Sequence, residues 1–140
     1  MIKSQAFQQL VDFINQKNNL LVITGAGISA SSGIPTYRDD NGVWQYSKPI
    51  EHQPFIDKLS QRQRYWSRSA VGWPAVANAT PNAAHKALAE LEKQNKIKLL
   101  VTQNVDGLHQ RAGHQNVIDL HGNLHHVICL GCEQREPRHL

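Results

Sequence analysis

A short run of branched apolar residues that leads directly into a glycine-rich turn constrains the fold of this chain most. Residues 20–23 read Leu-Leu-Val-Ile, and the next four are Thr24-Gly25-Ala26-Gly27. A run of this length that glycines terminate is typical of a buried strand in a parallel sheet. We therefore expect an α/β domain rather than a helical bundle or an all-β fold.

The rest of the chain alternates between helical and strand-like patterns. Phe7, Leu10, Val11 and Ile14 form one apolar stripe and predict an N-terminal helix. Further strands are expected over 97–101 and 117–120, with a short helix over 107–112 between them. This alternation predicts a parallel sheet with helices between its strands.

Two more helices are expected between the first and second strands. Residues 55–70 look helical and basic until Gly72 and Pro74 interrupt them. Thr80 followed by Pro81 predicts the start of the next helix, in which Ala84, Leu88 and Leu91 form the apolar stripe. Residues 33–54 contain too many glycines and prolines for regular structure and are expected to form a long functional loop.

Composition and charge exclude several classes of protein. Of 140 residues, 40% are hydrophobic and 19% are charged, which argues against disorder and allows one domain with a single core. No apolar run approaches the roughly 20 residues of a membrane helix, and the N-terminus lacks a signal-peptide core. We therefore expect a cytoplasmic protein with no membrane partner.

The net charge of +4 is concentrated in the basic stretch 57–70. A solvated helix face is the favoured interpretation of this stretch, and contact with an anionic cofactor or a partner protein is an alternative. A nucleic-acid surface is the least favoured one, so we expect no nucleic-acid partner.

Two segments near the first strand could bind a cofactor. Gly25, Gly27 and Ala30 match the dinucleotide pattern G-x-G-x-x-A, in which glycines allow the backbone to approach a pyrophosphate. A purely structural turn is the alternative, and no acidic residue stands clearly at the expected distance. In the loop that follows, Arg38 could pair with phosphate and Tyr37 could cover a pocket, unless this is an ordinary surface loop.

Polar residues also follow the second and third predicted strands. Residues 102–106 read Thr-Gln-Asn-Val-Asp, and ligands of parallel sheets bind beyond the carboxyl ends of strands. A loop that merely caps the next helix is the alternative. His121 follows the third strand and could act as a general base, although a structural histidine is the more common case. His125 and His126 are expected to be solvated.

The two cysteines, Cys129 and Cys132, are spaced for a metal or redox role in a reducing compartment. They form half of a zinc knuckle, because structural zinc takes four ligands. No second cysteine pair follows in this sequence, and His139 is a weak candidate for a third ligand.

These motifs, in this order, resemble the sirtuin family of NAD-dependent protein deacylases. The matching segments are GAGIS, SGIPTYRDDNGVW, TQNVDGLH and LHG, together with CLGC for half of the zinc site. RQRYWSRSAVGWP and PNAAHKAL resemble the class II branch, which includes mitochondrial lipoamidase-type sirtuins.

The resemblance implies a Rossmann-like NAD-binding domain, an acylated-lysine protein as the substrate, and transfer of the acyl group to ADP-ribose as nicotinamide leaves. It implies that His121 is the base that deprotonates a ribose hydroxyl and that Cys129 and Cys132 bind structural zinc. The residues that it assigns to NAD are Gly25, Ala26, Gly27, Ser29, Ile34, Pro35, Tyr37, Arg38, Gln103, Asn104, Val105 and Asp106.

The resemblance also predicts the domain organisation. Residues 1–124 would be an incomplete NAD-binding catalytic domain, with a cofactor loop and helical insertion over 33–80, and residues 125–140 would start a truncated zinc module. The family's second cysteine pair and later strands are not in this sequence, so a catalytically inactive remnant is an alternative. Transfer of ADP-ribose to protein is another, because it would use the same NAD pocket. The oligomeric state, the acyl-chain preference and the protein target are left open.

Overall fold

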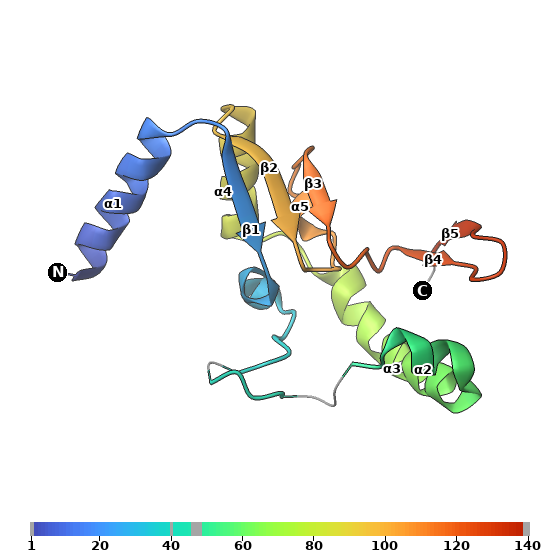
Figure 1. Ribbon diagram of the computed structural model, residues 1–140. Coiled ribbons are helices and arrows are strands. Elements are labelled where there is room, and N and C mark those ends of the chain that lie inside the picture. Colours follow the sequence, from blue (N-terminus) through green and yellow to red (C-terminus); the bar gives the residue numbers. More distant parts are fainter. Residues whose placement is uncertain (1, 40, 46–48, 139–140) are drawn as a thin grey trace.

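Three parallel strands form the centre of the molecule (Figure 1). The computed structural model describes residues 2–39, 41–45 and 49–138. In it, strands β1 (Leu20–Thr24), β2 (Ile97–Thr102) and β3 (Val117–Asp119) pair in that order, each within one residue of its predicted bounds. Thr24 lies opposite Thr102, and Thr102 lies opposite Asp119, so the three strands end at one edge of the sheet. The predicted parallel α/β sheet is confirmed.

Only one face of this sheet is covered within the described residues. Helix α4 (Ala83–Lys93) packs on that face together with the short helix α5 (Leu108–Arg111), and Leu100 and Leu108 are fully buried there. On the other face, Leu21 and Ile23 are 59% and 68% exposed. The prediction of a buried first strand is therefore wrong for this face, because alternate strand residues point to opposite sides and only one side carries helices.

Helix α1 (Ile2–Gln16) forms where the apolar stripe predicts it, yet it stands apart from the sheet in Figure 1. Its Phe7, Leu10 and Phe13 are all at least half exposed. The described contact that ties its end to the domain is polar, because the Lys96 ammonium donates to the backbone carbonyl of Asn15. Among the described residues, no helix is both long and apolar enough to cross a membrane.

The insertion between β1 and α4 contains a 3-10 helix, η1 (Ala26–Ser32), and then α2 (His52–Asp57) and α3 (Leu59–Asn78). The predicted loop over 33–54 therefore ends at residue 51. Helix α3 also continues through Gly72 and Pro74, where an interruption was predicted. A proline inside a helix costs roughly 3 kcal/mol. Burial of the neighbouring Trp73, whose ring packs edge-on against His125 and beneath the Arg138 guanidinium, offsets that cost.

Helix α4 begins two residues later than predicted, because Asn82 and not Thr80 is its N-cap. The Asn82 side chain accepts hydrogen bonds from the backbone amides of Ala84 and His85. Its amide nitrogen also donates to the carbonyl of Ile28 and to the Ser32 hydroxyl, at 2.7 and 3.0 Å. The side chain thus fastens α4 to η1. The buried face of the helix therefore differs from the predicted stripe of Ala84, Leu88 and Leu91. His85 and Ala89 are buried, and Ala84 is exposed.

The chain continues past the sheet into a small antiparallel hairpin, β4 (His126–Ile128) and β5 (Arg135–Pro137), which contains both cysteines. Arg138 holds the hairpin against α3, because its guanidinium donates to the Ser69 carbonyl at 3.0 Å.

Candidate functional site at the strand ends

The carboxyl ends of β1 and β2 bring three predicted site residues into one buried hydrogen-bonded network. The Ser29 hydroxyl donates to the Asp106 carboxylate at 2.7 Å, and the Asn104 side-chain amide donates to the Ser29 oxygen at 3.1 Å. Asn104 also donates to the Gly25 carbonyl at 3.1 Å. Ser29, Asn104 and Asp106 are 1%, 9% and 4% exposed. The network thus joins the loop after β1 to the loop after β2.

Local sequence holds Asp106 in place. Its second carboxylate oxygen accepts the Leu108 backbone amide at 2.9 Å, at the start of α5. Between them, Gly107 has a φ of 68°, and a Cβ there would lie 2.5 Å from the His125 ring. Glycine is therefore required for both its conformation and its size.

His125 is not solvated as predicted. Its Nε2 donates to the Asp106 carbonyl at 2.9 Å, so it braces the same loop from the other side.

Unlike Gly107, the glycines of the loop after β1 have open space around them. Apart from its immediate chain neighbours, no described atom lies within 4 Å of a Cβ built at Gly25 or Gly27, and neither has a positive φ. The described residues therefore do not require glycine at these positions, and the backbone is open to close approach by a ligand. The segment that follows is a seven-residue 3-10 helix. It ends at Gly33, which adopts a left-handed conformation with φ 84°.

His121 is exposed at the same edge of the sheet. Its Nδ1 lies 3.0 Å from the backbone carbonyl of Gln103. A carbonyl can only accept, so Nδ1 carries a proton, and in the neutral ring Nε2 is the acceptor nitrogen. The prediction that this histidine follows the third strand is confirmed, and its tautomer suits a general base.

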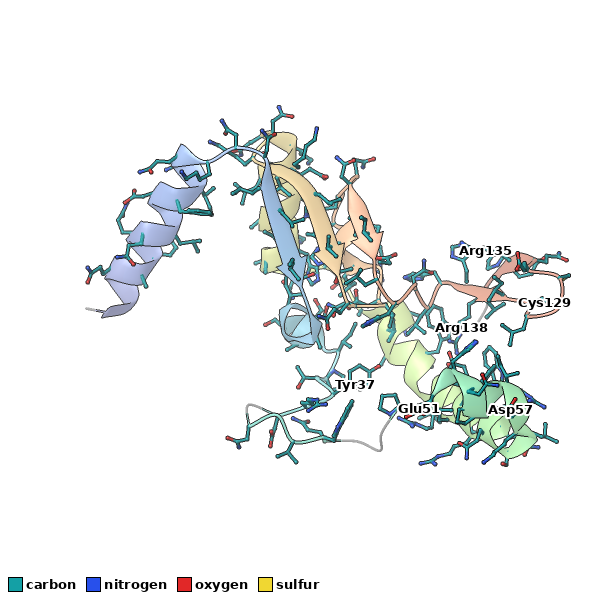
Figure 2. The ribbon with its side chains drawn as sticks, viewed as in Figure 1. Tyr37, Glu51, Asp57, Cys129, Arg135 and Arg138 are labelled. Atoms are coloured by element: carbon teal, nitrogen blue, oxygen red, sulfur yellow. The ribbon has the colours of Figure 1, made fainter. Side chains whose placement is uncertain are left out.

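The predicted cofactor loop is only partly joined to this network. Its start is fixed, because the Ile34 amide donates to the Ser29 carbonyl. Beyond Pro35, Arg38 contacts its own loop: it donates to the Gly42 carbonyl and stacks over the Trp44 ring at 4.2 Å. Tyr37 is 54% exposed, and Figure 2 shows it below the strand ends.

Gln103 and Val105 contribute to the site through their backbones. The Gln103 amide donates to the Thr24 carbonyl, and the Val105 carbonyl accepts from Leu124. The Gln103 side chain is exposed at the strand ends. His139, the weak candidate for a third metal ligand, lies outside the described residues.

Sequence reasoning missed a cluster of buried histidines directly behind the site. His85, His109 and His114 are at most 3% exposed, and the His109 ring centre lies 4.8 Å from His85 and 5.5 Å from His114. The Glu92 carboxylate, 3.2 Å from His114, closes one end of the cluster. One signal was available: positions 85, 89 and 92 share a helix face, and Ala89 is a core residue.

Burial disfavours the charged form of these histidines. It lowers the pKa of His109 to about 4, with smaller effects from the neighbouring His85 and His114. Burial also lowers the pKa of His85 and of His114, and the nearby Asp106 and Glu92 carboxylates, respectively, oppose it. For Glu92, burial acts to raise the pKa, but hydrogen bonds from the Gln115 and Asn116 amides outweigh it and leave the pKa lowered.

The cysteines lie far from this site, in the hairpin that Figure 2 shows on the opposite side of β3 from β1. Both are exposed. Hydrogen bonds from the backbone amides of Cys132 and Gly131 lower the pKa of the Cys129 thiol, and a thiolate is the form that binds metal. Among the described residues, no group of three or more possible ligands gathers to hold a metal ion.

One hollow of the described surface lies away from the strand ends. It lies between helices α2 and α3 and the hairpin, has a volume of about 550 Å³, and includes Phe55, Trp66 and Leu130 in its walls. None of the predicted site residues lines it. We place the candidate site by its chemistry, because the polar groups converge at the strand ends.

Comparisons with known proteins identify the family of the chain. A family model described as "Sir2 family" matches residues 25–139. The "NAD-dependent protein deacetylase" of Xanthomonas campestris pv. campestris (strain B100) is 55% identical over 135 residues, which are 96% of this chain and 46% of that protein. That of Bordetella pertussis (strain Tohama I) is 51% identical over 94% of this chain and 48% of its own length. The chain spans about half the length of the curated relatives it matches.

Solved structures give the same result. A Sir2 homologue mutant in complex with ADP-ribose superposes with a TM-score of 0.82 at 41% identity, over 93% of this chain and 52% of that one. A structure described as "Sir2 bound to acetylated peptide" gives 0.79 at 35% identity, over 93% and 51%.

Proposed function

This chain belongs to the Sir2 family, and from that premise we propose that it forms the cofactor-binding part of an NAD-dependent protein deacylase of the sirtuin type. NAD, when bound, would supply the ribose carbon that the acyl oxygen attacks as nicotinamide leaves. The acyl group would end on ADP-ribose. The relatives named NAD-dependent protein deacetylases and the Sir2 structures with ADP-ribose or an acetylated peptide support this proposal.

The single observation that carries the proposal is the buried Ser29–Asn104–Asp106 network beside open glycine backbone. The carboxylate and its partners fix two loops at the strand ends, where parallel sheets bind ligands. We propose that Gly25, Ala26, Gly27 and Ser29 approach the phosphates and ribose. Nicotinamide and its ribose would then lie against Gln103, Asn104, Val105 and Asp106, and the loop with Ile34, Pro35, Tyr37 and Arg38 would cover them.

His121 is proposed as the general base. The hydrogen bond to the Gln103 carbonyl fixes its ring and leaves Nε2 free to take a proton from a ribose hydroxyl. The same carbonyl belongs to the loop that would hold nicotinamide, so the base and the reacting ribose would be positioned by one segment.

We further propose that Cys129 and Cys132 supply two of the four thiolate ligands of a structural zinc ion. The amides that point at the Cys129 sulfur suit a metal-bound thiolate, although the described residues offer only these two ligands. The zinc would stabilise the hairpin and take no part in catalysis. We also propose that the chain belongs to the class II branch, which the segments RQRYWSRSAVGWP and PNAAHKAL resemble. A cytoplasmic location is proposed as well.

The proposal is tested with the whole protein, NAD and an acetyl-lysine peptide. We expect nicotinamide release that depends on the peptide, together with acetylated ADP-ribose. His121→Ala should bind NAD but lose turnover by at least about 100-fold. The matched control is His126→Ala, because His126 is also exposed and lies only five residues away.

Three results would contradict the proposal. ADP-ribose transferred to protein without any need for acetyl-lysine would favour the transferase alternative. Absence of both reactions would favour an inactive remnant. Retained turnover in His121→Ala would exclude this histidine as the base.

A further inference from the structure

We propose that His109 is a positioning residue that locks the two NAD-binding loops together through the hydroxyls of Thr24 and Thr102. This inference rests on the proposed function, because it concerns the same site. None of these three side chains is among the residues that the resemblance assigns to NAD or to catalysis. Figure 1 shows the place: the ends of β1 and β2, with α5 behind them.

A continuous chain of hydrogen bonds connects the three residues to the site. The Thr24 hydroxyl lies 2.9 Å from His109 Nε2 and donates to the Thr102 hydroxyl at 2.9 Å. The Thr102 oxygen in turn accepts the backbone amide of Asn104 at 3.0 Å. Thr24 is the last residue of β1 and Thr102 is the last residue of β2. The chain therefore spans the two strand ends from which both loops depart.

The lack of an acceptor at Nδ1 indicates the state of His109. Nδ1 is buried and has no hydrogen-bond partner among the described residues, so a proton on it would be unsatisfied. With the proton on Nε2, His109 donates to the Thr24 hydroxyl, which can then donate to Thr102. A neutral ring with the proton on Nε2 is thus the state that satisfies the chain.

The surroundings of His109 hold it in that state. It is 1% exposed, and the rings of His85 and His114 pack against it. Of the charged groups near the cluster, Glu92 faces His114. The Asp106 carboxylate is occupied by Ser29 and the Leu108 amide. No carboxylate therefore contacts His109 directly among the described residues, and a positive charge on its ring would be unpaired.

Loss of the His109 donor would disconnect the chain at Thr24. The Thr24 oxygen would lose a partner in a part-buried site, and the hydroxyl could turn away from Thr102. The Asn104 amide, and with it the position of its side chain between Gly25 and Ser29, would then be less fixed. We expect weaker NAD binding, with little change in the chemical step once NAD is saturating, because His109 and Thr102 are 1% and 2% exposed and the proposed base is His121.

The test compares two substitutions of His109 in the whole protein. His109→Phe fills the site but has no donor, whereas the side-chain amide of His109→Gln can donate again to Thr24. We expect the KM for NAD and the calorimetric Kd to rise about tenfold in His109→Phe, with kcat changed less than about twofold. His109→Gln should recover most of the NAD affinity. Thr24→Val should weaken NAD binding as much as His109→Phe, and the two together should be less than additive.

A matched control separates positioning from general loss of packing. His114→Gln alters a histidine that is equally buried and lies in the same cluster, but it does not touch the hydroxyl chain. It should lower thermal stability and leave the Kd for NAD unchanged. A nitrogen NMR spectrum of the unaltered protein without NAD should show His109 protonated at Nε2 alone at neutral pH.

Several outcomes would overturn the inference. One is that His109→Phe binds NAD as tightly as the unaltered protein. Another is that His114→Gln loses as much NAD affinity as His109→Phe. The third is a proton on Nδ1 of His109. If the unaltered protein does not bind NAD while the tautomer is as expected, the proposed function fails rather than the hydrogen-bond chain.

Discussion

The strand-end site and the cysteine hairpin are both clusters of chemically capable residues, but they are built differently. At the strand ends, Ser29, Asn104 and Asp106 are buried and find partners among one another. In the hairpin, Cys129 and Cys132 are exposed and lie near no third ligand among the described residues. A buried polar network needs every partner in place, whereas exposed thiols are satisfied by water until a metal arrives. Substitutions should therefore destabilise the first region and not the metal-free second.

The largest effect is expected at Asp106. Asp106→Ala would leave the Ser29 hydroxyl and the Leu108 amide without their acceptor in a buried place. We expect the free energy of unfolding to fall by about 3 kcal/mol, and NAD affinity to fall about 100-fold or more. Denaturant unfolding and calorimetry of the whole protein measure these two quantities.

The control for Asp106 is Asp119→Ala. Among the described residues, the Asp119 carboxylate accepts only from the exposed Gln110 side chain, so its loss should change stability by no more than about 0.5 kcal/mol. Equal losses in the two variants would mean that burial does not distinguish the strand-end network.

The second effect is acid destabilisation of the histidine cluster. The pKa of His109 is about 4 in the folded protein and about 6.5 when exposed, so protons bind the unfolded chain more tightly. Its contribution to stability is complete above about pH 6.5 and is lost as the pH falls towards 4, by at most about 3 kcal/mol. The lowered pKa values of His85 and His114 act in the same direction.

Unfolding free energies measured from pH 7 to pH 4 test this expectation. His109→Phe removes one titrating group and should give a shallower slope over that interval. A slope that is the same with and without the histidine would exclude it as a source of acid sensitivity.

A smaller effect is expected at Asn82, which caps α4 and also bonds to Ile28 and Ser32 in η1. Asn82→Ala should lower the denaturation midpoint by the equivalent of about 1 to 2 kcal/mol. Asn78→Ala is the matched control, because that side chain makes a single exposed bond to the Pro74 carbonyl. If both substitutions cost the same, Asn82 does not fasten η1 to α4.

The smallest effect is expected in the hairpin without metal. Cys129→Ser in the whole protein with a zinc chelator present should change the melting temperature by no more than the equivalent of about 0.5 kcal/mol. With zinc added, the unaltered protein should be stabilised and the variant should not. A large loss of stability in the chelated variant would remove the contrast between the two regions.

Much of the fold was predictable because its signals are local. Residues 20–23 are a branched apolar run, and 97–101 and 117–120 are apolar except at Lys98 and Asp119. Each segment forms a parallel strand at nearly the predicted bounds. The helix boundaries were less predictable where packing competes with propensity. Pro74 lies inside α3 because Trp73 beside it is buried, and that burial depends on His125 and Arg138, which lie more than fifty residues away.

The candidate site was likewise predictable in part. Local pattern is enough to place polar and glycine-rich segments after the strands, and therefore to place Ser29, Asn104, Asp106 and His121 at one edge of a sheet. Which of these side chains touch depends on how distant segments pack. Thr24 and His109 are 85 residues apart, and no pattern indicates their hydrogen bond. The physical reason is that strand periodicity is written in neighbouring residues, whereas the partner of a buried polar group is set by the packing of distant ones.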